Sequence, residues 1–101
     1  KLPDILSVNT IYSVETSNKL VLNLPAGVMG DFIQVDFITS DTAPTFTVIS
    51  ASGMSDCDLI PESDMIYSLY FDWGLLNYNG DTASYEYGWR FAYCSYSKTE
   101  V

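Results

Sequence analysis

The sequence predicts an all-β protein folded as an antiparallel β-sandwich, jelly-roll-like or Ig-like, with six to eight strands. Three observations lead to this prediction. Apolar residues recur at every second position in most segments, whereas the repeat of an amphipathic helix is hard to find. Clusters of Gly, Pro, Asp and Ser separate these segments. Hydrophobic residues make up 48% of the chain and aromatic residues 15%, which is enough to fill a core.

The chain is predicted to form a single domain over residues 1–101. A length of 101 residues is close to the commonest domain size. No linker, charge block, low-complexity tract or internal repeat divides the sequence. Because the chain begins with Lys1 rather than Met, we expect a processed product or a piece of something longer.

Four strands are expected in the first half of the chain. Residues 11–16 form the weakest candidate. In residues 20–24 leucine recurs at every second position, and residues 33–37 alternate apolar and polar side chains, as a half-buried strand does. Residues 45–49 are β-branched and aromatic, which suits a pleated surface. Pro44 precedes this last segment, at a position where proline is compatible with the start of a strand.

The second half of the chain predicts two long strands. In residues 65–73 every odd position is large and apolar, so this set should face the core: Met65, Tyr67, Leu69, Phe71 and Trp73. In residues 87–96, alternation places Trp89, Phe91 and Tyr93 on the core face. Between the two strands, Asn79-Gly80 is a strong turn signal because both residues tolerate positive φ.

The charge balance excludes two classes of partner. Thirteen acidic residues face four basic ones, which gives a net charge of −9. Binding to nucleic acid requires Lys and Arg to displace counterions, and an anionic membrane surface requires them too. No segment approaches the ~18 consecutive apolar residues of a membrane span, and no signal peptide is recognisable. We therefore expect no nucleic acid partner and no membrane insertion.

Most of the chemistry used by enzymes is missing from the sequence. The chain has no histidine, no phosphate-binding glycine motif and no CxxC pair. Asp72, beside Trp73, is the most suggestive carboxylate for an acid-base role. We nevertheless predict a protein that is not an enzyme and uses no cofactor. Cys57 and Cys94 either pair or stay as thiols, and the low cysteine count favours thiols.

An acidic segment offers a weak calcium-binding candidate. Asp56 and Asp58 alternate, and Glu62 and Asp64 follow a few residues later. Calcium takes six to eight oxygen ligands, which four acids and nearby carbonyls could supply. The spacing of an EF-hand is absent. The favoured interpretation is a solvated acidic loop, with no metal.

Tyrosines are the candidate binding residues for a ligand or partner. Tyr70, Tyr78, Tyr85 and Tyr87 fall outside the predicted core positions, and residues 78–87 are expected to form a long loop. Tyrosine provides a large, rigid contact area with a polar tip, so it is common in recognition surfaces. A plain surface loop is the alternative.

Arg90 is notable because cations are scarce in this chain. It faces away from the predicted core, opposite to Trp89. We expect a structural role for it, either pairing with a carboxylate such as Asp72 or stacking on a tyrosine.

Three segments together resemble small β-rich modules in structural proteins of bacteriophages that infect Gram-positive gut bacteria. They are residues 30–37, 67–74 and 87–93, and the resemblance covers about residues 20–96. It implies a virion-associated head or tail decoration, fibre module or receptor-binding piece, assembled in bacterial cytoplasm. It also implies a homo-oligomer, commonly a trimer, whose partners are other virion proteins or the host cell surface, protein or glycan.

The first hypothesis is therefore a non-catalytic virion structural or adhesion module. The alternative is a carbohydrate-binding module that stacks exposed Tyr and Trp on sugar rings. Glycan binding predicts at least two coplanar aromatic rings on one exposed face, whereas a virion module predicts a self-complementary apolar patch. The remaining hypotheses are an acidic inhibitor of a nucleic-acid enzyme and a small glycosidase.

Overall fold

The computed structural model describes residues 2–16, 18–50, 53–55 and 57–98. Within these ranges it is all β, with six strands and no helix. No helix in this part of the chain has the length and apolar character needed to cross a bilayer. The strands are β1 (Thr10–Thr16), β2 (Lys19–Leu24), β3 (Phe32–Thr39), β4 (Thr45–Ser50), β5 (Met65–Asn79) and β6 (Ser84–Ser97).

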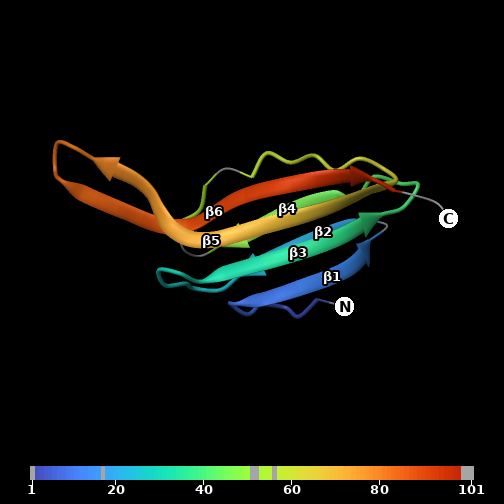
Figure 1. The fold of residues 1–101 in the computed structure, drawn as a ribbon, viewed down its shortest axis with the longest axis horizontal. Coiled ribbons are helices and arrows are strands. Elements are labelled where there is room, and N and C mark those ends of the chain that lie inside the picture. Colours follow the sequence, from blue (N-terminus) through green and yellow to red (C-terminus); the bar gives the residue numbers. More distant parts are fainter. Residues whose placement is uncertain (1, 17, 51–52, 56, 99–101) are drawn as a thin grey trace.

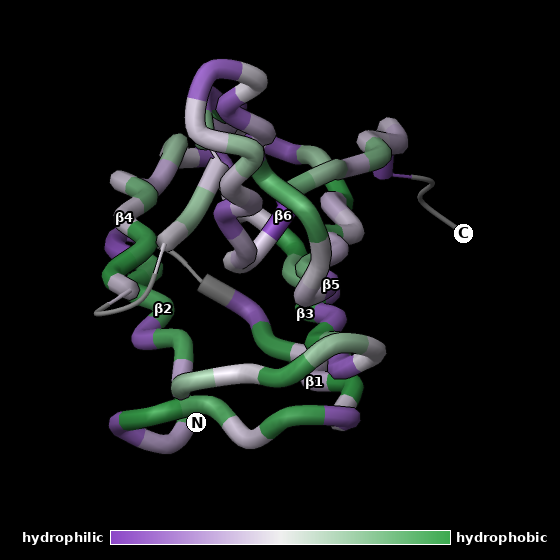
Figure 2. The backbone as a smooth tube through the Cα atoms, turned by 90° about the vertical axis from the view of Figure 1, so that its left-hand side faces the viewer, coloured by the Kyte–Doolittle hydropathy of each residue, from purple (hydrophilic) through white to green (hydrophobic). Residues whose placement is uncertain are grey.

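The strands form two sheets that share one core. Sheet A has the order β1-β3-β5-β6, and sheet B consists of β2 and β4. Figures 1 and 2 show β2 and β4 lying as a second layer against the larger sheet. The molecule is elongated, with extents of 54 × 24 × 21 Å, because the β5–β6 hairpin projects beyond both layers (Figure 1).

The expected antiparallel arrangement is wrong for half of the strand pairings. β1 pairs with β3 in parallel, and β2 pairs with β4 in parallel. Only β3 with β5 and β5 with β6 are antiparallel. The reason is that the chain alternates between the sheets from β1 to β4, so each strand pairs with the next but one. Parallel neighbours need a crossover connection, and here a strand of the opposite sheet provides it. The jelly-roll and Ig-like arrangements are antiparallel and do not match this order.

The core is built by the alternation that the sequence predicts. Every second residue of β2 and β3 is buried, and the same holds along β5 from Tyr67 to Phe71. Their side chains meet between the two sheets, where Phe46 of β4 stacks near Phe37 of β3, with ring centroids 6.4 Å apart. The central buried residues are Leu20, Leu22, Leu24, Ile33, Val35, Phe37, Tyr67, Leu69, Phe71 and Trp89.

Trp89 closes one end of this core. Its side chain is fully buried, and its ring lies edge-on to Trp73 with centroids 5.4 Å apart. Its indole N–H donates to the carbonyl oxygen of Pro25 at 2.8 Å. Gly27 passes close to both indole rings, because a Cβ placed there would lie 2.7 Å from the ring of Trp73. The predicted core position of Trp89 is confirmed.

The connection between β4 and β5 runs along the edge of β6 that does not pair with β5. Ser55 N–H donates to the carbonyl of Trp89 at 2.9 Å, and Trp89 N–H donates to the carbonyl of Gly53 at 3.0 Å. Farther along, the buried Thr39 hydroxyl donates to the carbonyl of Glu62 and accepts from Met65 N–H, both at 2.8 Å. These bonds hold the connection against sheet A at two points.

The segment predicted as a long loop, residues 78–87, is instead the far part of a hairpin. β5 continues to Asn79 and β6 begins at Ser84, so only four residues form the turn. Asn79 Oδ1 accepts from the N–H of Asp81 at 3.0 Å. Positive φ falls on Ala83, and not on Asn79 or Gly80 as expected. The turn signal is confirmed at Asn79-Gly80, but its mechanism is a side-chain cap.

Candidate functional site

One face of β6 carries an unbroken row of five aromatic side chains. Tyr85, Tyr87, Trp89, Phe91 and Tyr93 alternate along the strand, on the side that faces the core. The row is covered only in its middle. Trp89 is fully buried, whereas Tyr85 is 59% exposed and Tyr87 is 44% exposed. A core-like face therefore continues outward on the hairpin, where Tyr87 only borders an apolar hollow with Val28 and Met29 of the β2–β3 connection.

Tyr93, at the other end of the row, was predicted to be a core residue and is 45% exposed. Its ring still packs on Phe91, with centroids 5.9 Å apart, and on Tyr67 at 6.4 Å. The side of β6 on which Tyr93 was predicted to lie is therefore correct. Burial is incomplete because sheet B has only two strands, which cannot cover the four strands of sheet A.

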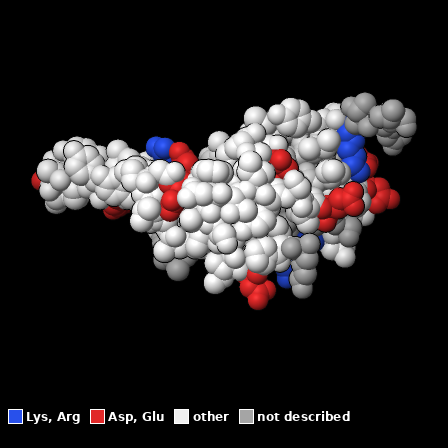
Figure 3. Space-filling model, turned by 60° about the horizontal axis from the view of Figure 1, so that its bottom comes forward, with Lys and Arg blue, Asp and Glu red and all other residues white. Residues whose placement is uncertain are grey.

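The ribbon formed by residues 74–88 brings three of the four predicted tyrosines together. Tyr78 lies directly opposite Tyr85 across the hairpin, with ring centroids 4.8 Å apart and planes tilted by 44°. Tyr85 and Tyr87 follow at 6.4 Å with a tilt of 30°. On the face seen in Figure 3 the projecting ribbon is largely uncharged. The three tyrosines form one exposed cluster, which we call the tyrosine cluster.

The ribbon begins where two glycines face each other. Gly74 lies opposite Gly88 in the hairpin, and the register shifts by a bulge between Leu75 and Asn77. The Arg90 guanidinium lies over Gly74, so that a Cβ there would approach its carbon to 2.6 Å. Bulges bend the strand and increase its twist. The ribbon therefore changes direction at this point, as Figure 1 shows.

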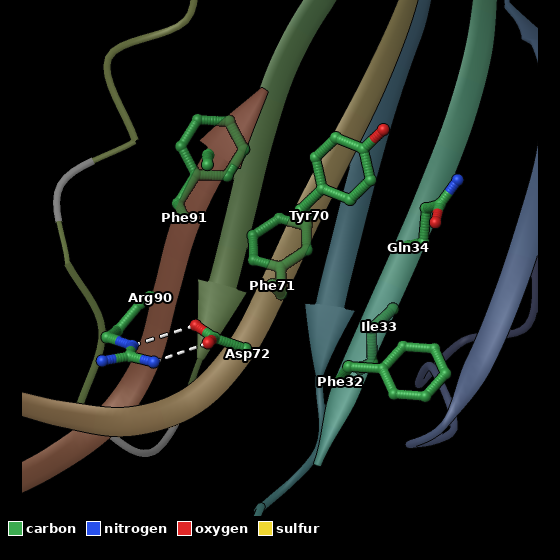
Figure 4. Close-up of a pocket in the computed structure, with 9 residues that line it drawn as sticks. Phe32, Ile33, Gln34, Tyr70, Phe71, Asp72, Arg90 and Phe91 are labelled. Atoms are coloured by element: carbon green, nitrogen blue, oxygen red, sulfur yellow. Dashed lines mark hydrogen bonds and ion pairs between the residues drawn. The ribbon is translucent and has the colours of Figure 1, made fainter. Parts of the chain in front are cut away.

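Tyr70, the fourth predicted tyrosine, is not part of the tyrosine cluster. It lies on the outer face of sheet A, 40% exposed, between Gln34 of β3 and Ala92 of β6 in the register. Its neighbours outline a hollow of about 400 Å3, which is lined also by Phe32, by the Asp72–Arg90 pair and by the adjacent Ile33, Phe71 and Phe91. Figure 4 shows these side chains around the hollow. We call this feature the outer hollow.

Sequence reasoning assigned none of Phe32, Gln34 and Ala92 to a site, although all three line the outer hollow. Phe32 is 42% exposed, since it has the opposite parity to the buried Ile33 at the start of β3. Ala92 is the smallest side chain in its row across the sheet and leaves space beside Tyr70. An apolar residue out of step with the alternation was the available signal for Phe32. The space above Ala92 depends on strand pairing and has no sequence signal.

Arg90 and Asp72 form a two-bonded ion pair across β5 and β6, as expected. Nε donates to Oδ1 at 3.0 Å and Nη2 donates to Oδ2 at 2.6 Å (Figure 4). Hydrogen bonds from Arg90 lower the pKa of Asp72, with its charge adding to the effect. The same contacts raise the pKa of Arg90. A general acid requires a raised pKa, so the direction of this shift does not suit Asp72 to the general-acid role.

The acidic segment does not gather into a metal site where the structure describes it. Asp58 and Glu62 lie exposed in the connection, and Asp64 lies 3.8 Å from the Lys98 ammonium. Asp56 falls outside the described residues. No group of three metal-ligating side chains occurs within residues 2–16, 18–50, 53–55 and 57–98.

The two cysteines are not joined by a disulfide. Cys57 is half-buried in the connection, and Cys94 is exposed on β6. The favoured expectation of two thiols is confirmed.

Comparison with protein-family models, with curated proteins and with solved structures finds no match to this chain.

Proposed function

We propose that the protein is a non-catalytic binding module that attaches to a partner protein through its projecting ribbon. One observation carries the proposal: the aromatic row of β6 is buried at Trp89 and open at Tyr85 and Tyr87. The open part consists of the same type of side chain as the core and lacks only a covering layer. Burying that face against a partner would gain the hydrophobic free energy that the fold itself leaves unused.

The geometry of the tyrosine cluster favours a protein partner over a sugar at this position. Stacking on a sugar chain would need rings that lie in a common plane. The rings of Tyr78 and Tyr85 are tilted by 44°, and those of Tyr85 and Tyr87 by 30°. Tilted rings interdigitate with the side chains of another protein surface, where tyrosine is enriched.

The edges of the ribbon support the same function. β3 pairs with β5 only as far as Asp72, and the connection pairs with β6 only near Trp89. Beyond these points neither edge of the ribbon has a strand neighbour among the described residues. Free edges invite pairing with another chain. The bulge near Leu76 and the charges of Asp81 and Glu86 discourage uncontrolled growth of such contacts.

The setting that we propose is a bacteriophage particle, where the protein is a structural or adhesion module. The resemblance of residues 30–37, 67–74 and 87–93 to phage structural modules supports this setting. In it the partners are other virion proteins or the host surface, and the module assembles with itself, as a trimer in the commonest form. The net charge of −9 disfavours nucleic acid as the ligand.

The test is the mass of the protein in solution, measured by light scattering over a wide range of concentration. We expect a defined oligomer that dissociates in Tyr85→Ser. Tyr96→Ser is the matched control, because Tyr96 is also an exposed tyrosine of β6, 52% exposed compared with 59% for Tyr85. It lies at the opposite end of the strand and should leave the oligomer intact. A strict monomer at every concentration would contradict the self-assembling form of the proposal.

A further inference from the structure

A second surface of the molecule has the chemistry of a small-molecule site. It is the outer hollow, which lies on the face of sheet A turned away from sheet B. Its volume of about 400 Å3 falls within the range of about 300–1,000 Å3 that is usual for ligand pockets. Such pockets combine apolar walls with a few fixed polar groups. The walls of this hollow determine which ligand it would fit.

Two aromatic side chains provide the apolar walls. Phe32 of β3 and Tyr70 of β5 are 42% and 40% exposed. Phe32 pairs with Asp72 in the register, so Tyr70 is its diagonal neighbour on the same face of the sheet. Diagonal neighbours in a sheet lie about 7–8 Å apart, within reach of aromatic side chains. On the other side of Tyr70, Ala92 of β6 lies directly opposite it, and the small side chain of Ala92 leaves space beside the Tyr70 ring.

The polar wall is held in place before any ligand arrives. Asp72 binds two of the five N–H donors of Arg90, at 3.0 and 2.6 Å. Within the described residues, no hydrogen bond to another residue uses the other three donors of the guanidinium or the outer lone pairs of the carboxylate. These groups therefore stay available to a ligand. Arg90 is further positioned by Gly74, whose missing Cβ leaves room for the guanidinium. On the opposite wall, Gln34 is fixed by its amide, which donates to Asp36 at 3.1 Å.

This combination of groups matches one class of ligand. The ring face of Phe32 or of Tyr70 suits the C–H face of a single sugar ring, and paired donors and acceptors suit its neighbouring hydroxyls. The two charges neutralise each other within the ion pair. The rest of the chain is strongly acidic, with a net charge of −9, which disfavours an anionic ligand. We propose that the outer hollow binds a neutral hexose or N-acetylhexosamine unit of a glycan.

The proposal is independent of the ribbon. The tyrosine cluster lies on the core-facing side of sheet A beyond the core, whereas Tyr70 and Ala92 lie on its outer side. A module that attaches to its assembly by the ribbon would thus present the hollow on another face. Variants of the two surfaces separate the two proposals.

The test begins with wild-type protein on an array of neutral and acidic oligosaccharides. A neutral oligosaccharide that binds is then titrated into 15N-labelled protein. We expect saturable shifts of the Gln34 and Ala92 amide signals and of the Arg90 Nε–H signal. We expect none at the amides of Tyr78 and Tyr85. Lack of binding to any neutral sugar on the array would overturn the proposal.

Variants test the geometry of the hollow. Tyr70→Ala should weaken binding about tenfold, and Tyr70→Phe should restore it because the ring is kept. Ala92→Leu should abolish binding by filling the space, at an exposed strand position that accepts leucine. Ile60→Ala is the control and should bind sugar as the wild type does, because Ile60 is an 84% exposed residue of the β4–β5 connection that belongs neither to the hollow nor to the ribbon. Equal binding by Ala92→Leu and wild type would contradict the proposal.

Two further outcomes assign the hollow to another occupant. Shifts at Gln34 and Ala92 that follow protein concentration alone, with no effect of sugar, would assign it to a second copy of the chain. Binding of acidic sugars only, with neutral ones inactive, would show that Arg90 acts as a cation site. Either result would overturn the assignment to a neutral sugar.

Discussion

The indole N–H of Trp89 donates a hydrogen bond to the carbonyl oxygen of Pro25, at 2.8 Å and across 64 residues of sequence. This bond joins β6 of sheet A to the chain that leaves β2 of sheet B. The ring fills the space between the sheets at the same time, since none of it is exposed. One side chain therefore ties the two layers together by packing and by a directed bond.

Replacing this ring should be among the most damaging single substitutions. Trp89→Ala should lower the free energy of unfolding by ~3–5 kcal/mol, because a large cavity opens and the Pro25 carbonyl loses its donor. Trp89→Phe should lie between wild type and alanine, since it keeps much of the packing but not the bond. Urea unfolding followed by fluorescence measures both. A loss below ~1 kcal/mol for alanine would contradict the buried position.

Gly88 should not accept any side chain. A Cβ there would collide with the carbonyl of Gly53, which pairs with Trp89. Gly88→Ala should cost ~1–3 kcal/mol, the usual range for overpacking. Gly80→Ala is the matched control, because its nearest neighbour would be the Tyr78 ring at 3.7 Å. That variant should change stability by less than ~0.5 kcal/mol. Equal effects would show that the connection does not press against β6.

Thr39 should be replaceable only by serine. Its hydroxyl serves the carbonyl of Glu62 and the N–H of Met65 in a fully buried position. Thr39→Val keeps the shape but leaves both backbone groups without this partner, at a cost of ~1–3 kcal/mol. Thr39→Ser keeps the hydroxyl and should lose much less. Thermal unfolding of the two variants gives the comparison, and a valine variant as stable as wild type would contradict the bonding described.

The ion pair predicts a pH dependence with a definite sign. Arg90 lowers the pKa of Asp72 below its ordinary value of 3.8, chiefly by hydrogen bonding. The pair thus stabilises the fold fully above that ordinary pKa, and the contribution is lost as the pH falls through the lowered one. The gain is small because both side chains are about half exposed. A carboxyl 13C titration should place Asp72 below ordinary aspartates, and Arg90→Gln should return it toward them.

The sequence predicts the strands well because alternation is a local property. In residues 33–37 and in residues 65–73, the alternation within the segment itself predicts which side chains face the core, and the structure agrees with it. The Asp72–Arg90 pair could also be foreseen, since a lone cation on an outward face attracts a nearby carboxylate. The residues of the tyrosine cluster were foreseen, but as a loop, because polar residues between Tyr78 and Tyr87 mask the end of two long strands.

Pairing between strands is not encoded in the same way. Nothing in residues 11–16 specifies β3 as a parallel neighbour, because partner choice follows from how the chain crosses between layers. The outer hollow depends on the same information. Phe32, Tyr70 and Ala92 come from three strands, and only the register brings them into one place. The partial exposure of Tyr93 is likewise set by the width of the opposite sheet.

The interleaving of β1 to β4 has a consequence for how the chain acquires its fold. None of these four strands pairs with its neighbour in sequence, so each parallel pair must enclose a strand of the other layer. The β5–β6 hairpin alone joins consecutive strands, and hairpins form in about 1–10 μs. We expect the hairpin to nucleate folding and the nested parallel pairs to condense onto it over milliseconds to seconds, as distant contacts require.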